Sequence, residues 1–254
     1  MRRRSIRRQG MRLHHQLLIL FTLPISLLFV MRNLSRQLST PSRQYEYDID
    51  NNSGVISDSI PKNLVQSYSN ISKLPPKVWS NVLEFAPGYK HYVFDDANAT
   101  SFLRHHFRPE VVARFENLTD GEHKADLFRY AFLYIKGGVW LDADVEMRVP
   151  MDDIFSKFNN TIYSVKSGQF NSIFQAIIGS PPRTDTMHEL VEEIVTREKH
   201  LNGHGLPFTE WFGEHILRKT GQQSLTTGTV LTNLISNNSK GTNFYLFQEG
   251  LSSS

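Results

Sequence analysis

The sequence predicts an α/β domain, in which short strands and amphipathic helices alternate around one mixed sheet. Three observations support this prediction. Strand-like and helix-like segments alternate from residue 60 onward, a double glycine separates a long helical pattern from an apolar run at 139–141, and two aspartates follow that run. Because ligands of open α/β sheets bind beyond the carboxyl ends of strands, these aspartates mark the expected functional site.

The predicted strands and helices follow from the spacing of apolar residues. Short apolar runs bounded by turn residues predict strands, at residues 60–68, 91–94, 139–141, 161–165, 173–178 and 243–247. Apolar positions that recur at helical spacing predict helices, at residues 76–84, 97–106, 109–115, 123–136, 184–200 and 207–220. The chain has no cysteine, so no disulfide contributes to this fold.

The helix before the double glycine has one apolar face. Phe128, Ala131, Phe132 and Ile135 recur at i, i+3, i+4 and i+7, which places them on one side of a helix. The glycines at 137–138 end that helix, because glycine adopts the left-handed conformation without a Cβ penalty. The sequence therefore predicts a helix, a sharp turn and a buried strand in direct succession.

Two acidic residues follow the strand predicted at 139–141. Asp142 and Asp144 are one residue apart, and side chains at i and i+2 of an extended chain point the same way. Their like charges repel each other unless a cation lies between them. A hard divalent ion that also holds a diphosphate fits this arrangement, because such ions use one or two carboxylates plus phosphate oxygens.

A second charged pair lies on the helix. Asp126 and Arg129 are three residues apart, so they are neighbours on the helix surface, off its apolar face. A fixed carboxylate and a fixed guanidinium beside a metal suit a sugar nucleotide. The carboxylate can bind the sugar hydroxyls, and the guanidinium can bind the phosphate. The alternatives are a plain surface ion pair on the helix and, for Asp142 and Asp144, two solvated turn acids.

The motifs that carry this pattern resemble glycosyltransferase family 32, the DXD-containing group that includes initiation-specific α-1,6-mannosyltransferases. The likeness rests on Ala-Asp-Leu-Phe-Arg-Tyr at 125–130 and Gly-Gly-Val-Trp-Leu-Asp-Ala-Asp-Val-Glu at 137–146. It extends from about residue 60 to 234 and includes further short matches, at Ile60-Pro61-Lys62, Pro87-Gly88-Tyr89, Asp95-Asp96 and Thr227-Gly228-Thr229.

The resemblance implies a GT-A-type, Rossmann-like nucleotide-sugar-binding domain. It also implies a retaining transfer of a hexose from a nucleotide-diphosphate sugar to a hydroxyl of a glycan, glycolipid or glycoprotein. GDP-mannose is the first expectation for the donor, and a UDP-hexose is the alternative. Mn²⁺ or Mg²⁺ is the expected cofactor, with Asp142 and Asp144 as its ligands.

The resemblance also assigns a role to each charged residue. Asp144 is expected to be the direct metal ligand, while Asp142 is expected to reach the metal or the ribose. Arg129 is expected to hold phosphate and Asp126 the sugar hydroxyls. No residue stands out as a catalytic nucleophile.

Further residues match donor-contacting positions of the family, at Tyr68, Gly138, Trp140, Thr227 and Gly228. Tyr68 stands in place of a family tryptophan and could stack on the base, or could be a half-buried strand tyrosine. Trp140 replaces a family tyrosine and could simply belong to the core. The sequence also departs from the family at Val65, where the family has histidine, and Asp95 and Asp96 could bind substrate or only cap a helix.

The charge of the chain is uneven. Residues 1–36 hold eight arginines and no acid, and removing these eight from the 28 Lys and Arg leaves 20 against 25 Asp and Glu. The remainder therefore has a net charge of −5. This balance excludes the basic surface that nucleic-acid binding requires.

The N-terminal segment reads as a membrane anchor, because an apolar run follows the arginines without a convincing cleavage site. A cleaved signal is the alternative. We expect a single-pass type II protein of the Golgi or endoplasmic reticulum membrane, with its domain in the lumen. The expected parts are a basic cytosolic tail at 1–12, an anchor at 13–31, a luminal stem at 32–58, the catalytic domain at 59–247 and a polar tail at 248–254.

Luminal exposure would also make the Asn-x-Ser/Thr sequons glycosylation acceptors, at Asn33, Asn51, Asn70, Asn98, Asn117, Asn159 and Asn237.

Two other function classes compete with the glycosyltransferase interpretation. Because the chain stops earlier than its family pattern, a catalytically inactive nucleotide-sugar- or glycan-binding paralogue stays open. A haloacid-dehalogenase-type phosphatase also begins with an apolar strand and Asp-x-Asp, but Glu146 occupies the position where that class has Thr or Val.

Overall fold

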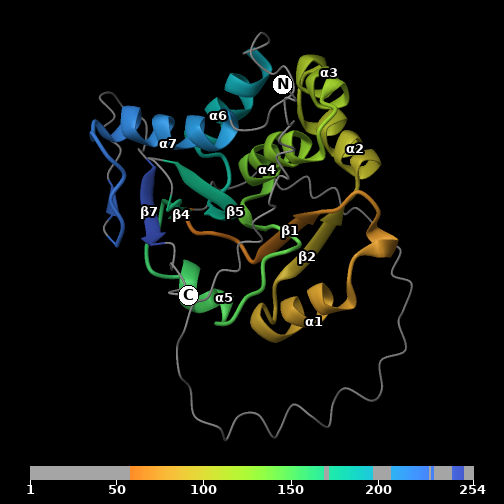
Figure 1. Ribbon diagram of the computed structural model, residues 1–254, viewed down its shortest axis with the longest axis horizontal. Coiled ribbons are helices and arrows are strands. Elements are labelled where there is room, and N and C mark those ends of the chain that lie inside the picture. The colour runs from red at the N-terminus through yellow and green to blue at the C-terminus, as the bar shows by residue number, and fades with distance from the viewer. Residues whose placement is uncertain (1–57, 169–171, 197–206, 229, 232–241, 249–254) are drawn as a thin grey trace, which may run out of the picture.

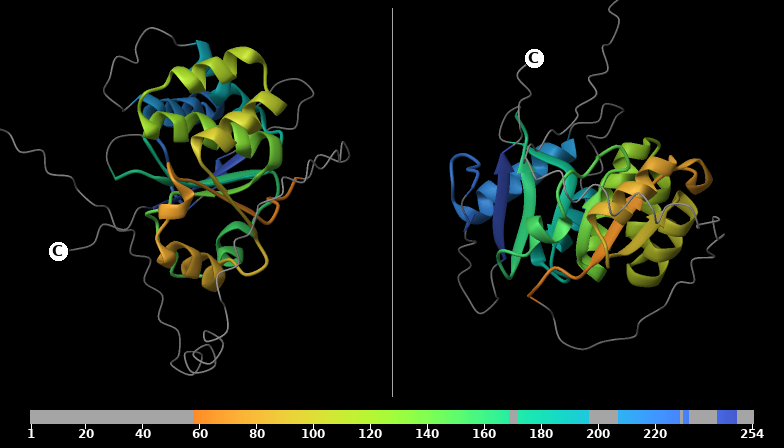
Figure 2. Two further views of the ribbon diagram at one scale, coloured as in Figure 1. Left: turned by 90° about the vertical axis from the view of Figure 1, so that its right-hand side faces the viewer. Right: turned by 90° about the horizontal axis from the view of Figure 1, so that it is seen from below.

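The computed structural model describes residues 58–168, 172–196, 207–228, 230–231 and 242–248. These residues form a seven-stranded mixed sheet in the order β2-β1-β3-β5-β4-β7-β6 (Figure 1). Helices cover both faces of the sheet, so the domain has three layers (Figure 2). The predicted mixed α/β architecture is confirmed.

The strands lie within one to three residues of their predicted bounds, except for the additional strand β6. They are β1 (Asn63–Ser67), β2 (Lys90–Phe94), β3 (Gly138–Leu141), β4 (Thr161–Lys166), β5 (Ile173–Ser180), β6 (Val230–Leu231) and β7 (Asn243–Gln248). β1 is parallel to both β2 and β3, whereas β5 is antiparallel to β3 and to β4. β7 is parallel to β4 and antiparallel to β6.

Within the described residues, six helices match the predicted ranges, and two short ones, at 71–73 and 151–155, were not predicted. They are the 3₁₀ helix η3 (Ile71–Lys73) and α1 (Pro76–Phe85), α2 (Asp96–His106), α3 (Pro109–Asn117), α4 (Gly121–Lys136), α5 (Met151–Phe155), α6 (Asp185–Thr196) and α7 (Pro207–Thr220). Proline begins α1 and α3, where its missing N–H costs no helical hydrogen bond. The last predicted residues of the helix at 184–200, from 197 on, lie outside the described residues.

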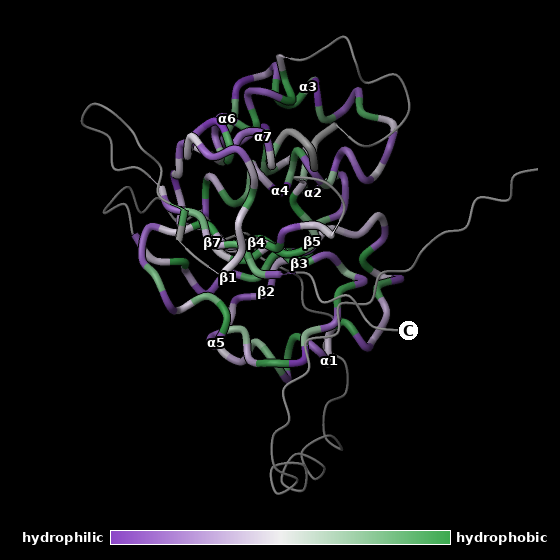
Figure 3. Tube along the Cα trace, turned by 60° about the vertical axis from the view of Figure 1, so that its left-hand side comes forward, coloured by the Kyte–Doolittle hydropathy of each residue, from purple (hydrophilic) through white to green (hydrophobic). Residues whose placement is uncertain are grey.

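Alternating strand residues build two cores, one on each face of the sheet. The first, here called the α4-side cluster, packs beneath α2, α3, α4, α6 and α7 and includes the strand residues Val65, Phe94, Trp140, Ile162 and Ile178. The second, the α1-side cluster, packs against α1 and α5 and includes Leu64, Val139, Tyr163, Val165 and Ile177. Hydrophobic residues accordingly concentrate along the strands and on the helix faces toward them (Figure 3).

The double glycine has two separate structural roles. Gly137 ends α4 with φ +63°, a conformation that L-residues rarely adopt. Gly138 begins β3 at φ +117°, and a Cβ there would overlap the carbonyl oxygen of Asn63. Glycine at 138 therefore lets β3 approach β1 closely enough for Leu64 to pair with Val139.

One strand has no counterpart among the predicted elements. After Thr227-Gly228, Val230 and Leu231 pair with Tyr245 and Phe244 as strand β6. Backbone pairing with β7 satisfies polar groups that a helix would satisfy internally. The predicted tail, anchor and nearly all of the stem, residues 1–57, lie outside the described residues, within which no helix has the length and apolarity to cross a bilayer.

Candidate functional site

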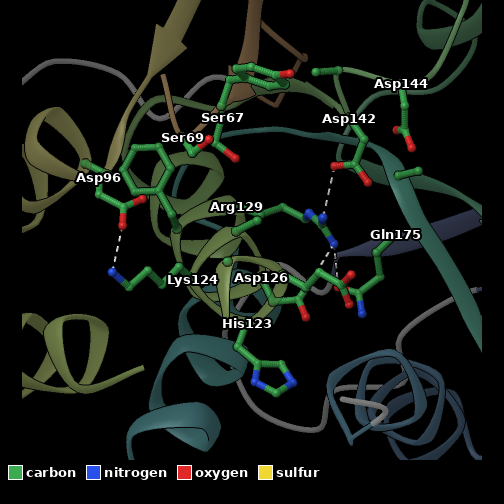
Figure 4. Close-up of a pocket in the computed structure, with 18 of the residues that line it drawn as sticks. Ser67, Ser69, Asp96, His123, Lys124, Asp126, Arg129, Asp142, Asp144 and Gln175 are labelled. Carbon is green, nitrogen blue, oxygen red and sulfur yellow. Dashed lines mark hydrogen bonds and ion pairs between the residues drawn. The ribbon is translucent and has the colours of Figure 1, made fainter. Parts of the chain in front are cut away.

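A hollow of about 730 Å³ opens at the carboxyl ends of the three parallel strands. Its walls come from the segments after β1, β2 and β3, from the first turns of α4, and from the start of β5 (Figure 4). Its volume falls in the usual range for small-molecule sites. The chain leaves β1 toward β2 on one side and places β3 on the other, which is the topological position where α/β sheets bind ligands.

Asp142 is fixed by two donors on one oxygen. Its Oδ1 accepts from the Trp140 indole Nε1 at 2.6 Å and from Arg129 Nη2 at 3.1 Å. Trp140 lies two residues before Asp142, on the same side of the chain, and is fully buried. The Arg129 guanidinium carbon also lies 5.0 Å from the centre of the Trp140 ring. The side chain that begins the DXD motif is therefore held in one orientation by the core.

Arg129 connects three acceptors beneath the hollow. Its Nη2 reaches Asp142, while its Nη1 donates to Asp126 Oδ1 at 2.8 Å and to Gln175 Oε1 at 3.1 Å. Burial opposes the charged guanidinium, but Asp142 and Asp126 outweigh burial, so the pKa of Arg129 is raised. The side chain is 5 % exposed, so the alternative of a surface ion pair is wrong.

The Asp126 carboxyl has a raised pKa. Burial raises the pKa of its carboxyl to about 6, although Arg129 acts in the opposite direction. Asp142 and Glu122 add to the increase because their negative charges disfavour another anion nearby. The carboxyl, whose side chain is 16 % exposed, therefore lies in a mostly buried, negatively charged environment with one compensating cation.

Asp144 has a contrasting environment. It lies at the exposed rim of the hollow, and none of the described residues forms a hydrogen bond or ion pair with its carboxylate. Within the described residues no group of three or more His, Cys, Asp or Glu is placed to hold a metal ion. Asp144 and the second oxygen of Asp142 fit a divalent ion that takes its remaining ligands from substrate phosphates and water.

The structure brings five of the nine predicted site residues to the hollow, namely Tyr68, Asp126, Arg129, Asp142 and Asp144. The other four do not line it: Gly138, Trp140, Thr227 and Gly228. Gly138 lies at the opposite end of β3, and Trp140 acts from the core, through Asp142. The Gly228 N–H donates to the Leu246 carbonyl, and the Thr227 hydroxyl contacts Gln248. This loop therefore lies beside β7, three strands away from β3 in the sheet order.

Both aspartates after β2 have structural partners as well as a place in the hollow wall. The Oδ1 atom of Asp95 caps α2 by accepting from the Asn98 N–H at 2.8 Å. Asp96 forms an ion pair with Lys124 at 2.6 Å (Figure 4). The helix-capping interpretation is therefore confirmed for Asp95.

Sequence reasoning missed Gln175. It lies on β5, is 5 % exposed, and lines the hollow while its Oε1 accepts from Arg129 and from the Tyr130 hydroxyl. No local pattern identifies it, because its partners lie 45 and 46 residues away. The i, i+2 spacing of Trp140 and Asp142, by contrast, could have revealed their contact.

Residues 76–161 match the family described as glycosyltransferase sugar-binding region containing DXD motif. An uncharacterized glycosyltransferase of Acanthamoeba polyphaga mimivirus is 29 % identical over 135 residues, which are 53 % of this chain and 53 % of that protein. The initiation-specific alpha-1,6-mannosyltransferase of Candida albicans is 29 % identical over 101 residues, 39 % of this chain and 26 % of that protein.

The inositol phosphoceramide mannosyltransferase 3 of Schizosaccharomyces pombe is 26 % identical over 139 residues, 53 % of this chain and 37 % of that protein. The matched stretch thus spans about half the length of the mimivirus relative and less of the fungal ones. Among solved structures, the PaToxG glycosyltransferase shares the fold, with a TM-score of 0.50 and 13 % identity over 65 % of this chain and 72 % of that one.

Proposed function

We propose that this chain transfers a hexose from a nucleotide-diphosphate sugar to a hydroxyl group, because residues 76–161 match the DXD-containing glycosyltransferase sugar-binding family. The acceptor is a glycan, glycolipid or glycoprotein. Mannose, from GDP-mannose, is the first candidate because the fungal relatives are named mannosyltransferases. A UDP-hexose is the alternative donor.

One observation carries this proposal above the others. Asp126 and Arg129 from α4 meet Asp142 and Asp144 from the end of β3 in one open hollow. Arg129 lies between the acids and contacts both Asp126 and Asp142. Carboxylates that face hydroxyls and a guanidinium that faces phosphate are the polar groups that a sugar nucleotide requires.

Asp142 and Asp144 would hold Mn²⁺ or Mg²⁺. The ion would neutralise charge that develops on the leaving diphosphate. The chain itself contributes orientation, because Trp140 and Arg129 fix Asp142 before any ligand arrives. Such preorganised dipoles and charges need no rearrangement at the moment of reaction.

In this proposal Arg129 and Asp126 divide the donor between them. The guanidinium stabilises the diphosphate from below, and the buried Asp126 carboxyl accepts hydrogen bonds from sugar hydroxyls. The half-buried Tyr68, at the wall formed after β1, supports the nucleoside. We propose retention of anomeric configuration by family resemblance, without assigning a nucleophile.

The cellular setting is also part of the proposal. We propose that residues 13–31 anchor the protein in a Golgi or endoplasmic reticulum membrane, with the domain in the lumen. The motivation is the arginine-rich, acid-free N-terminal segment. Protease protection of the domain in sealed microsomes tests this orientation, and digestion without detergent contradicts it.

Donor binding and turnover test the activity. A panel of GDP-mannose, UDP-glucose, UDP-galactose and UDP-N-acetylglucosamine with Mn²⁺ is screened by thermal shift, because a ligand of the folded state raises its apparent stability. Transfer or hydrolysis of the binding donor is then measured for the wild type, Asp144→Asn and Glu146→Gln. Glu146 is the matched control, an exposed acid on the same loop that does not line the hollow.

Each result of this assay has a distinct meaning. Turnover that disappears in Asp144→Asn and survives in Glu146→Gln supports the transferase. Donor binding without turnover in the wild type favours the inactive paralogue. If no nucleotide sugar binds, the proposed function is wrong.

A further inference from the structure

Gln175 is a buried amide in the wall of the hollow that the proposed roles leave unused. It lies on β5, where the Asp142 N–H donates to the Ala176 carbonyl at 2.8 Å. Beyond the last printed pair of β3 and β5, Leu141 with Ile177, Gln175 and the three residues of the DXD motif line the same hollow.

An irregularity in β5 turns Gln175 toward α4. Tyr163 pairs with Gly179 and Val165 with Phe174, so β5 advances five residues while β4 advances two. As a result Phe174 and Ile177 both pack in the α1-side cluster although they are three residues apart. A regular strand would place them on opposite faces, and bulges of this kind re-aim side chains near functional sites.

The bulge has its own hydrogen-bonding support. The Ser164 hydroxyl lies 3.3 Å from the Phe174 carbonyl oxygen and 3.1 Å from that of Ile177, which are the two ends of the bulged segment. With this segment fixed, Gln175 lies on the α4 face of the sheet, where it meets Arg129 and Tyr130. Its position is therefore determined by the fold.

The same contacts decide which way the Gln175 amide faces. Its Oε1 lies against two donors, Arg129 Nη1 and the Tyr130 hydroxyl. Guanidinium nitrogens only donate, so the amide oxygen must point toward Arg129 and the amide nitrogen away from it. None of the described residues accepts from Nε2, and this atom is not among the buried polar atoms that lack a partner. Nε2 therefore keeps N–H groups free to donate, on a side chain that lines the hollow (Figure 4).

We propose that Gln175 is a specificity-determining residue of the donor site, whose Nε2 donates to an oxygen of the transferred sugar, and that Tyr130 is the positioning residue that orients it. This inference rests on the proposed glycosyltransferase function. It adds a contact from a strand outside the DXD motif and outside the family match at 76–161.

The charge of the neighbourhood favours a sugar over a phosphate as the partner of Gln175. The diphosphate carries negative charge and is matched by the Arg129 guanidinium. A neutral amide suits a neutral hydroxyl, and the nearby acids Asp126 and Asp142 accept but do not donate when ionised. Gln175 therefore supplies the neutral donor that hydroxyl recognition lacks in this wall, and sites built on such contacts discriminate between sugars.

Tyr130 is suited to the positioning role. It is buried, and burial, with Asp126 adding to it, keeps the pKa of its hydroxyl well above the ordinary value. The hydroxyl thus stays protonated and donates to Gln175 Oε1. Without it, Arg129 alone would hold the amide.

Calorimetric titration of the full chain tests the proposal. The dissociation constants of GDP-mannose and of GDP are measured with Mn²⁺, or those of UDP-glucose and UDP if the donor screen selects the uridine series. The variants are Gln175→Met and Tyr130→Phe. Gln66→Met is the matched control, because Gln66 is a fully buried strand glutamine that does not line the hollow.

The expected result is a change in the ratio of the two dissociation constants. Gln175→Met should weaken the nucleotide sugar about 3- to 10-fold and leave the nucleoside diphosphate within about 2-fold, because one neutral hydrogen bond is lost. Tyr130→Phe should show a smaller change of about 2- to 3-fold. Gln66→Met should leave the ratio unchanged.

A purely structural role predicts a different outcome. Binding of the nucleoside diphosphate then weakens together with the nucleotide sugar, which keeps the ratio constant and overturns the proposal. Unchanged affinity for both ligands in Gln175→Met overturns it as well. If the wild type binds no nucleotide sugar, the proposed function fails first, and this inference fails with it.

Discussion

Two parts of the hollow wall differ sharply in their physical environment. The inner wall, defined as Asp126, Arg129, Asp142 and Gln175, is joined by hydrogen bonds and ion pairs around one guanidinium with a 5 % exposed side chain. The rim, defined as Asp96, Lys124 and Asp144, carries two exposed acids, and among the described residues its one ion pair joins Asp96 to Lys124. The inner wall therefore supports the fold as well as the shape of the hollow, whereas the proposed role of the rim is in ligand binding alone.

The DXD motif itself is divided between these two regions. Asp142 is oriented by Trp140 and Arg129, while Asp144 lies at the exposed rim. Only one residue separates the two, so the boundary between the hydrogen-bonded inner wall and the exposed rim passes through the motif. Substitutions on either side of that boundary should separate effects on stability from effects on activity.

The largest expected effect is at the centre of the inner wall. Arg129→Met should lower the free energy of unfolding by about 3–5 kcal/mol, because it leaves Asp126 and Asp142 without their buried cation. Urea denaturation measures this loss. Arg104→Met is the control, since Arg104 forms an exposed ion pair with Glu116 that contributes about 0–1 kcal/mol. Equal losses in both variants would contradict the structural role of the inner wall.

The next largest effects are expected at Asp142 and Asp144, whose substitutions should differ in their effect on stability. Asp142→Asn and Asp144→Asn should each lower turnover by about 100-fold or more, as expected when a group that stabilises transition-state charge is removed. Asp142→Asn should also lower the free energy of unfolding by about 1–3 kcal/mol, because Arg129 loses a charged partner. Asp144→Asn should change stability by less than about 0.5 kcal/mol. Equal stability losses would remove the proposed boundary.

A pH effect should arise from the inner wall. The pKa of Asp126 rises from 3.8 to about 6 on folding, so the folded chain binds this proton more tightly than the unfolded chain. The resulting stabilisation is complete below about pH 4 and is lost as the pH rises through 6. We expect a loss of about 1–3 kcal/mol over this range.

The variant Asp126→Asn provides the comparison for this pH effect. Its unfolding free energy should lack the decline between pH 4 and 6 that the wild type shows, because the amide does not titrate. Denaturation curves at half-unit pH intervals measure both proteins. Parallel pH profiles would show that another group is responsible.

The smallest effect is expected at the rim. Lys124→Met removes the ion pair with Asp96, whose side chain is 59 % exposed, and should change the unfolding free energy by at most about 1 kcal/mol. Chemical denaturation of this variant alongside Arg129→Met gives the contrast directly. A loss near that of Arg129→Met would show that the rim also supports the fold.

The sequence was sufficient for much of the fold because its signals are local. The apolar spacing of α4, the glycines after it and the apolar strand before Asp142 each depend on neighbouring residues. The same locality predicted that Asp126 and Arg129 lie in one hollow with Asp142 and Asp144. Their burial was underestimated, because helix spacing alone does not reveal that β5 contributes a further wall above them.

The remaining features depend on contacts between distant segments. Gln175 reaches Arg129 only because β5 bulges against β4, and no short pattern predicts that irregularity. Thr227 and Gly228 matched a family loop, yet pairing of the neighbouring strands β6 and β7 holds this loop away from the hollow. Such pairings between segments far apart in sequence decide which matching residues actually meet.

Gly138 has a consequence for reading genetic variation in this chain. Its missing side chain keeps β3 against Asn63, and the far end of that same strand carries Asp142. A bulkier residue at 138 would push this end of β3 away from β1. The displacement would also change the position of Asp142, which directly follows the other end of the strand. An inactivating replacement there would imitate the loss of a ligand-binding residue although every polar group of the hollow is intact.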